Sequence, residues 1–395
     1  MPWGCRRLLR GGWAQRGEQL QVSAELVDVR DKTQMWGEQF NRKATDLLQV
    51  QTEISQQIAE KLRLRLTSAE QRQLVKEAQA HPQAYEQVLK GRFHISKATP
   101  DGFKKAVEHY HQAIAVDPNY AFAYAGLASA YRVLAANGFL DPKEAMPKAE
   151  AAAKRALELD ESLAEAHSVL AQIKQSAWDW AGAEREFKRA IELNSNLATA
   201  HTKYAFYLSL MGRHAEAIAE VRRGKELDPV WLTNSVNVGV ALFFARQYDL
   251  AIEELNKSLE MDQNFPFAHA VLGYTYDAKG EFTQAITEYQ ETIKLEGEST
   301  GLQCYLGYAL AKAGRRGEAE AILKQLKVTK EYVSPAELAL LYLGLGEKDK
   351  ALSELERAYA AHDLQMGFLG VDPHYDSLRS EPRFQELIRK VGLPQ

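Results

Sequence analysis

Three short patterns in the sequence consist of residues that could carry out chemistry. Gly297–Gly301 (GESTG) matches the G-x-S-x-G pattern of a serine nucleophile, which requires a strand before the serine, but here a predicted helix precedes it. His214 and Glu216 match the His-x-Glu part of a zinc deaminase site, but no Pro-Cys-x-x-Cys sequence follows. His109 and His111 fall on opposite sides of a predicted helix and cannot easily share a metal ion. We predict that none of these residues is catalytic or binds metal, and that the chain has no cofactor.

Other signatures of enzymes are absent from the sequence. It contains no G-x-x-x-x-G-K phosphate loop, no kinase H-R-D or D-F-G sequence, and no H-E-x-x-H zinc motif. The two cysteines, Cys5 and Cys304, give neither a disulfide framework nor a metal-ligand spacing. We therefore predict that the chain is not an enzyme.

The elements that carry these residues are predicted to be helices in a repeated series. A triplet of residues recurs at helical spacing, as in Ala183, Phe187 and Ala190. Its first residue is small and its second is usually large and apolar or aromatic. The leading alanines of six copies lie 34, 34, 34, 34 and 32 residues apart, at Ala183, Ala217, Ala251, Ala285, Ala319 and Ala351. Two earlier copies begin at Ala106 and Ala149.

A second series precedes the leading alanines by 12 or 13 residues. Each member joins a large residue to a small one: Leu170-Ala171, Tyr204-Ala205, Val238-Gly239, Leu272-Gly273, Leu306-Gly307 and Leu338-Ala339. We predict that each pair lies on the first helix of a repeat and that its small member permits close approach of the second helix. The leading alanine should meet it there, as Ala251 would meet Gly239.

These residues resemble the tetratricopeptide-repeat (TPR) pattern, which combines a 34-residue period with this order of large and small residues. The resemblance extends over about residues 82–360 and implies about eight repeats. It implies an all-α solenoid, a right-handed superhelix of antiparallel helix pairs. Residues Ala136–Pro142 are predicted to be an extended turn in the second repeat. Residues 361–395, where the pattern has stopped, are predicted to be a capping segment.

Residues 1–80 differ from the repeats. Leu20–Leu26 alternates apolar and polar side chains and is predicted to be a strand, and Met35–Phe40 is predicted to return as a second strand. Helices are predicted to start at Thr45 and Ser68. We therefore expect a short N-terminal α/β remnant, built from a β-hairpin and helix, before the solenoid.

Part of this segment is similar to the end of the small TolB-amino-terminal-like domain that precedes TPR arrays in bacterial signalling proteins. The similar stretches are Gln21–Asp28, Trp36–Arg42 and Val50–Ile54. Those proteins join the domain to a serine/threonine kinase, a winged-helix DNA-binding domain or a nucleotide cyclase. Two functions therefore stay open: an interaction scaffold in a bacterial signalling or regulatory system, or the C-terminal fragment of a kinase or transcription regulator whose effector domain is missing from this chain.

The TPR resemblance implies that the first helix of each repeat lines a concave groove. The groove-facing positions include aromatic residues: Phe206, Phe243, Phe244, Phe267, Tyr274, Tyr305 and Tyr308. Aromatic side chains on an open concave face suit an extended or helical peptide, although each could instead pack against the neighbouring repeat. We predict that these residues bind a protein or peptide partner, and we expect no small-molecule substrate.

Two tryptophans, Trp178 and Trp180, flank Asp179 in the turn of the third repeat. Two interpretations stay open for them. They could pack against that turn, or they could form a binding hot spot.

Composition limits the remaining partners. The net charge is −4 and no basic block suggests nucleic acid, so none is expected as a partner. No apolar run approaches the ~18 residues that span a bilayer, and Met1–Gly12 lacks the apolar stretch of a signal peptide. We expect a cytoplasmic protein. The alternative is the extracytoplasmic part of a membrane-anchored protein, because similar proteins often place a membrane span before this region.

Overall fold

The structure is a computed structural model, and it describes residues 7–16, 19–28, 34–43, 53, 81–96, 99–136, 139–229 and 231–394. The chain divides into two compact units. Unit 1 comprises residues 1–170 and 192–195, and unit 2 comprises residues 171–191 and 196–395. The boundary therefore falls inside helix α7 (Ala164–Ser176).

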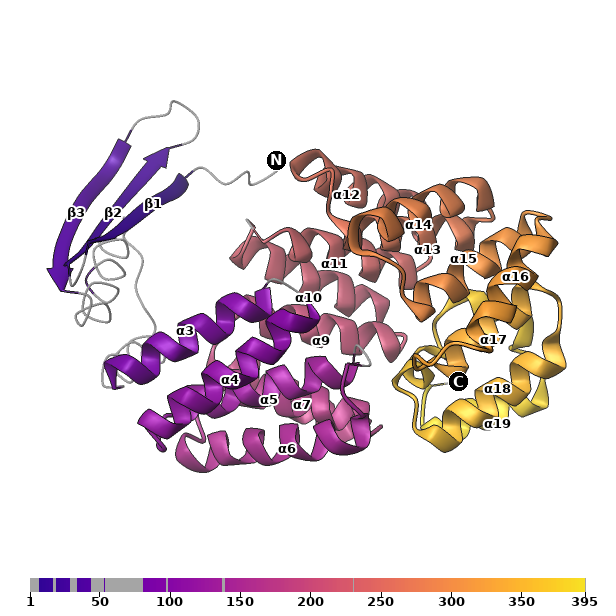
Figure 1. Ribbon diagram of the computed structural model, residues 1–395, viewed down its shortest axis with the longest axis horizontal. Coiled ribbons are helices and arrows are strands. Elements are labelled where there is room, and N and C mark those ends of the chain that lie inside the picture. The colour runs from indigo at the N-terminus through magenta and orange to yellow at the C-terminus, as the bar shows by residue number, and fades with distance from the viewer. Residues whose placement is uncertain are drawn as a thin grey trace. The chain divides into compact units, whose positions relative to one another are not determined.

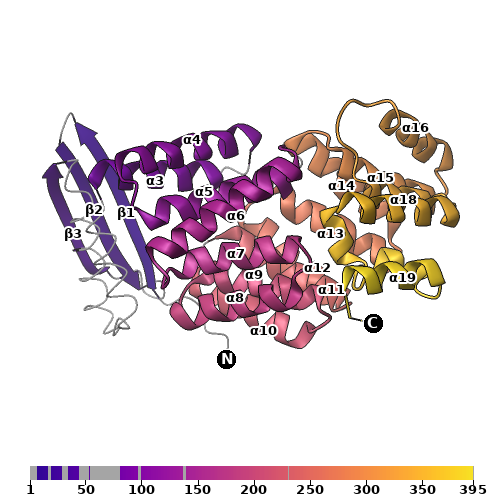
Figure 2. The ribbon, with the colours of Figure 1, turned by 90° about the horizontal axis from the view of Figure 1, so that it is seen from below.

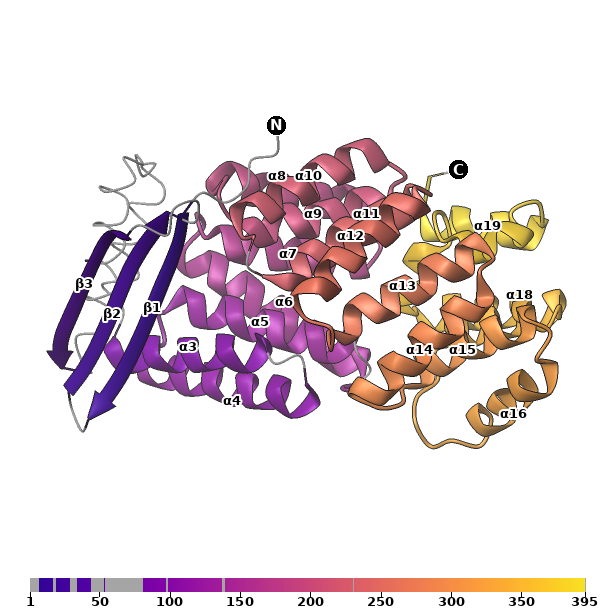
Figure 3. The same cartoon turned by 90° about the horizontal axis from the view of Figure 1, so that it is seen from above.

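Unit 1 begins with an antiparallel sheet. Its strands are β1 (Arg7–Arg16), β2 (Gln19–Asp28) and β3 (Gln34–Lys43), and they lie in the order β1-β2-β3 (Figure 3). The alternating residues from Leu20 onward lie on β2, and the stretch that returns lies on β3. Trp36 and Phe40 of β3 are buried, four residues apart on one face of the sheet.

The sequence did not predict β1. Its like residues are adjacent, as in Leu8-Leu9 and Gly11-Gly12, and do not alternate. β1 pairs with β2 along all ten of its residues, so pairing with a neighbour accounts for this strand better than its own pattern does. Apart from Glu53, which is helical, the helices predicted from Thr45 and Ser68 lie outside the described residues, as does the centre of the turn predicted at Ala136–Pro142.

Four helices of unit 1 form two antiparallel pairs (Figure 2). They are α3 (Pro82–Ser96), α4 (Pro100–Val116), α5 (Ala121–Ala136) and α6 (Pro142–Leu159). Proline occupies the first turn of α4 and α6, where its missing N–H costs nothing. The side chains of Thr99 and Asp141 cap these two helices by accepting the backbone N–H groups of Gly102 and Lys143.

The helices of unit 2 also form antiparallel pairs in succession (Figure 1). After the end of α7 they are α8 (Trp180–Leu193), α9 (Ala198–Leu210), α10 (His214–Leu227), α11 (Leu232–Phe244), α12 (Tyr248–Met261), α13 (Pro266–Lys279), α14 (Phe282–Glu296), α15 (Thr300–Lys312), α16 (Arg316–Leu326), α17 (Pro335–Gly344) and α18 (Lys348–Ala361). Two short 3₁₀ helices, η2 (Leu364–Phe368) and η3 (Pro373–Leu378), and the last helix α19 (Pro382–Val391) follow.

The repeat positions form the core of this fold. All the leading alanines have 0% exposure, at Ala106, Ala149, Ala183, Ala217, Ala251, Ala285, Ala319 and Ala351. The large residues that follow them, such as Phe187, Leu255 and Tyr289, are fully buried as well. The structure thus confirms the all-α repeat fold that the 34-residue spacing predicted.

The contact at the small residues differs from the predicted one. The sequence placed Ala251 against Gly239, but a methyl group built on Gly239 would lie 2.7 Å from the side chain of Leu255. In the next repeat, a methyl group on Gly273 would lie 2.3 Å from the ring of Tyr289. The glycine therefore makes room for the large residue of the second helix. The leading alanine is buried one turn earlier on that helix.

Two glycine substitutions test this packing. Gly273→Ala should destabilise the protein by ~1–3 kcal/mol, because the added methyl group overlaps a buried ring that cannot move away. Gly317→Ala, at the second residue of α16, should stabilise it by at most ~0.5 kcal/mol, because alanine is the better helix former and nothing lies within 4 Å of the new methyl group. Urea unfolding followed by circular dichroism measures both. Equal midpoints for the two variants would contradict the packing described here.

Candidate functional site

Ser299 and Glu216, from two of the enzyme-like patterns, have structural contacts. Ser299 lies in the loop between α14 and α15, where its hydroxyl accepts the Leu302 N–H at 3.2 Å and caps α15. His214 is the first residue of α10, and Glu216 forms an ion pair with Arg213. The elements on either side of both patterns in the chain are helices.

The two histidines of α4 contact different partners. His109 Nδ1 lies 2.7 Å from the Gln87 side chain, and His111 Nε2 lies 3.1 Å from the Tyr131 hydroxyl. Across the residues that the structure describes, no group of three or more His, Cys, Asp or Glu side chains could hold a metal ion.

Most of the predicted partner-binding residues gather on one side of unit 2. We call this side the aromatic face, and it consists of Phe206 on α9, Phe243 and Phe244 on α11, Tyr274 on α13, and Tyr305 and Tyr308 on α15. Phe243, Phe244 and Tyr308 are buried, and the other three are half-buried. Phe267 is 39% exposed in the first turn of α13, where it packs edge-on against Phe265.

The C-terminal segment, residues 362–394, covers the aromatic face. Phe368 of η2 lies 5.7 Å from the ring of Phe206 and 5.9 Å from that of Phe244. Val371 belongs to the same buried cluster as Phe243 and Phe244. The burial of this face therefore comes from the chain's own segment as well as from neighbouring repeats.

A histidine of this segment lies at the centre of the face. The His374 ring is 5.1 Å from Tyr308 and 5.6 Å from Tyr305, edge-on to both, and 6.4 Å from Phe243. Its side chain is 1% exposed. An imidazole at such a place needs polar partners, because burial of an unpaired polar group is costly.

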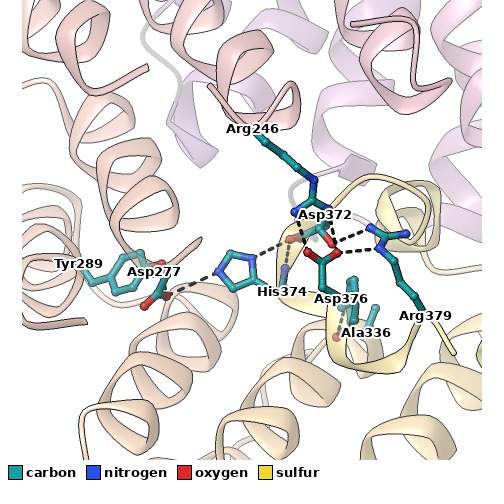
Figure 4. A network of polar contacts seen from close by, with 9 residues as sticks. Arg246, Asp277, Tyr289, Ala336, Asp372, His374, Asp376 and Arg379 are labelled. Atoms are coloured by element: carbon teal, nitrogen blue, oxygen red, sulfur yellow. Dashed lines mark hydrogen bonds and ion pairs between the residues drawn. The ribbon is translucent and has the colours of Figure 1, made fainter. Parts of the chain in front are cut away.

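The carboxylate of Asp372 is hydrogen-bonded to one nitrogen of this ring, and the carboxylate of Asp277 lies within ion-pair distance of the other (Figure 4). His374 Nδ1 lies 2.6 Å from Asp372 Oδ1, and His374 Nε2 lies 3.7 Å from Asp277 Oδ2. The Tyr289 hydroxyl donates a hydrogen bond to Asp277 Oδ2 at 2.8 Å. Asp277 comes from the inner side of α13, whereas the other carboxylate belongs to the segment itself.

Burial and charge act in opposite directions on this histidine. Burial alone would lower the pKa of His374, but the carboxylates of Asp372 and Asp277 outweigh it and raise the pKa to about 10. Burial raises the pKa of Asp277, and the contacts with His374 and Tyr289 oppose that rise. At neutral pH we therefore treat His374 as a cation between two carboxylates.

A second charged contact joins the segment to α11. Arg246, just after α11, donates two hydrogen bonds to the Asp376 carboxylate, at 2.6 and 2.8 Å, and Arg379 donates a third at 2.7 Å (Figure 4). The two arginines outweigh burial and hold the pKa of Asp376 below its usual value. The Tyr375 hydroxyl also donates to the Ala336 carbonyl at 3.0 Å.

The two tryptophans contact the far end of unit 2. Trp178 stacks on His362 with ring centres 3.8 Å apart, and on Tyr359 at 5.6 Å. Trp180 donates its indole N–H to the Val391 carbonyl at 2.8 Å. Neither of the two open interpretations named this contact, which joins α8 to α18 and α19.

The sequence did not single out the charged members of this site. Asp277, Arg246 and His374 belong to no motif. Arg246 and His374 also lie outside the α-helices of the repeats. Asp277 did leave a signal. It is an acidic residue near the end of an otherwise apolar stretch of α13, and its side chain is 0% exposed.

Solved structures resemble this architecture at low sequence identity. A human IFIT1 dimer with m7Gppp-AAAA aligns with a TM-score of 0.53 and 15% identity, over 80% of this chain and 78% of that one. A chain of the APC/C hetero-tetramer Cut9-Hcn1 aligns with a TM-score of 0.51 and 16% identity, over 73% of this chain and 52% of that one. Cut9 is a tetratricopeptide-repeat protein. This chain has the TPR fold.

Sequence comparison adds one relative of the TPR chain. "Putative adenylate cyclase 3" of Rhizobium meliloti strain 1021 is 25% identical over 173 residues. The match covers 42% of this chain and 29% of the length of that protein. No protein-family model matches the sequence. In the part of the TPR chain that is described, no helix has the length and apolar character to cross a membrane.

Proposed function

We propose that this TPR chain is a scaffold that binds a protein or peptide partner on the aromatic face of unit 2. One observation carries the proposal: the face already holds a stretch of polypeptide that belongs to no repeat. Two 3₁₀ helices lie against it, held by ring contacts, by a buried histidine and by a two-point arginine contact. A surface that binds irregular backbone within one molecule has the features needed to bind another peptide.

A signalling role is the finer part of this proposal. The similarity to a cyclase from Rhizobium meliloti supports a TPR array that docks partners for a signalling enzyme. The second candidate function is the C-terminal fragment of a kinase or transcription regulator. It rests on the similarity of the N-terminal stretches Gln21–Asp28, Trp36–Arg42 and Val50–Ile54 to the domain found in such proteins. Reading the coding sequence upstream of Met1 separates them: cyclase, kinase or winged-helix motifs in the same frame favour a fragment, and an in-frame stop codon favours a separate scaffold. We assign no catalytic step to this chain.

Phe267, which is not one of the six residues of the aromatic face, offers a direct test at its edge. Phe267 lies two helical turns before Tyr274 on α13, so the two side chains point to the same side of the helix. Because Phe267 is 39% exposed, it is accessible while the C-terminal segment is in place. A partner that binds the face should therefore use Phe267 as an aromatic anchor.

We expect Phe267→Ala to weaken binding of such a partner by ~2 kcal/mol, about thirtyfold, without changing the melting temperature. The partner is first captured with the full-length chain from its source cells, identified by mass spectrometry and purified. Titration calorimetry then compares the wild type, Phe267→Ala and the control Met261→Ala, which alters a 61% exposed residue at the end of α12. Equal affinities for all three proteins would move the binding site away from this face.

A further inference from the structure

The C-terminal segment presents three chemical groups to the aromatic face. Phe368 offers a ring, His374 offers an imidazole six residues later, and Asp376 offers a carboxylate two residues after that. We propose that residues 364–378 compete with the partner for this face, and that the partner is a peptide with the same three groups at the same spacing. The inference rests on the proposed function, because it names the chemistry of the partner for that site.

The first position of the face accepts an aromatic ring. Phe368 meets Phe206 edge-on, with an interplanar angle of 69°, and lies nearly parallel to Phe244, at 29°. Both arrangements are ones that aromatic pairs prefer. The neighbouring members of this cluster, Leu210 and Val371, are apolar. A ring is therefore the group that this position selects.

The second position accepts a cationic ring. The edge-on tyrosines Tyr305 and Tyr308 fit a flat side chain, and Asp277 supplies a carboxylate from the repeats themselves. With an aliphatic side chain in this place, the Asp277 carboxylate would be buried without a cation beside it. Such a charge is strongly unfavourable, so the position discriminates in favour of histidine.

The third position accepts a carboxylate. Arg246 presents two parallel N–H groups to both oxygens of Asp376, a geometry that matches a planar carboxylate. The two side chains are 43% and 42% exposed. Arg246 and Asp376 can therefore separate without exposing the core. A partner can begin to displace the segment at this contact.

The remainder of the segment sets a further requirement. Met366, Leu369 and Leu378 have 0% exposure, so a competing peptide must bring apolar residues to the same places. The last helix has its own anchors, because Phe384 and Leu387 of α19 are buried in the same cluster as Leu355 of α18. Met366, Leu369, Tyr375 and Leu378 belong to this cluster too. We therefore infer that residues 364–378 leave the face only as the partner's apolar residues replace them, while α18 and α19 hold both ends. A peptide with the sequence of residues 363–380 meets every requirement.

This peptide, labelled with fluorescein, provides the test in the full-length chain. The loosened variant Phe368→Ala with Asp376→Ala weakens the segment and leaves the face intact. We expect fluorescence anisotropy to show at least about tenfold tighter peptide binding to the loosened variant than to the wild type, because the competitor is weaker. Adding Arg246→Ala should reduce that affinity about tenfold, and a peptide with Asp376→Ala should not respond to Arg246→Ala. The variant Asp376→Ala alone, which changes a half-exposed contact, serves if the double variant does not fold.

Three results would overturn the inference. One is a folded loosened variant, with wild-type circular dichroism, that binds the peptide no better than the wild type does. Another is sedimentation of the loosened variant as a dimer, which would mean that the segment exchanges between copies of the chain. The third is a captured partner that binds the wild type and the loosened variant equally, and this result would leave the scaffold proposal intact.

Discussion

Replacing Asp277 by alanine should lower the free energy of unfolding of unit 2 by about 3 kcal/mol at pH 7. The substitution leaves the buried cation of His374 with one carboxylate in place of two, and it leaves the Tyr289 hydroxyl without its acceptor. Breaking a buried charge pair at one partner is among the most destabilising single changes. Urea unfolding of the full-length chain, with hydrogen exchange at α13 and η3 to locate the loss, measures the effect.

The pH dependence of this pair has a definite sign. His374 has a raised pKa of about 10 in the folded protein, against an ordinary value of 6.5. Its contribution to stability is therefore fully present below pH 6.5 and is lost as the pH rises towards 10. The wild type should become less stable across this window, and Asp277→Ala should show a shallower decline.

An exposed aspartate gives the matched control. Asp249 on α12 forms an ion pair with Lys279 at 2.9 Å, but its side chain is 87% exposed. Asp249→Ala should leave the melting temperature and its pH dependence nearly unchanged, because solvent screens such pairs. If both aspartate variants behaved alike, the network around His374 would not stabilise the C-terminal segment.

The sequence was sufficient for the repeats because their contacts are local. The two helices of a repeat are neighbours in the chain, so the positions that must be small recur at a constant interval, as Ala217, Ala251 and Ala285 do. It was insufficient for the detail of each contact. Spacing shows that Gly239 and Ala251 face the same interface, but it does not show that Leu255 fills the space over the glycine.

The aromatic positions could be found from the sequence, but their cover could not. Position in the repeat predicts where Phe206 and Tyr274 point, and burial by a neighbouring repeat was an open alternative. The contact of Arg246 with Asp376 spans 130 residues and follows no period. Nothing in the local pattern of residues 362–381 indicates that they return to the face, because irregular backbone has no periodic signature. Partner binding by these residues stays a prediction.

Replacing Trp180 by alanine should cost about 3 kcal/mol and release the last helix, because this indole joins the beginning of unit 2 to its end. Its N–H donates to the Val391 carbonyl across 211 residues of sequence, and its ring packs against Tyr207. Methyl groups built on Gly367 and Gly392 would each lie 3.4 Å from ring atoms of this indole. Hydrogen exchange should therefore accelerate throughout α19.

Trp180→Phe separates the two parts of this effect. The phenyl ring retains much of the packing but cannot donate to Val391, so the loss should fall to about 1 kcal/mol, the usual net value of one hydrogen bond. Trp231→Ala, at a 40% exposed tryptophan before α11, should leave exchange in α19 unchanged. If Trp180→Ala left that exchange unchanged too, the contacts of α19 with α18 would be enough to hold the end of the chain. Because the segment over the aromatic face is bounded by these two helices, the result also determines whether release of the face requires the Trp180 contact to open.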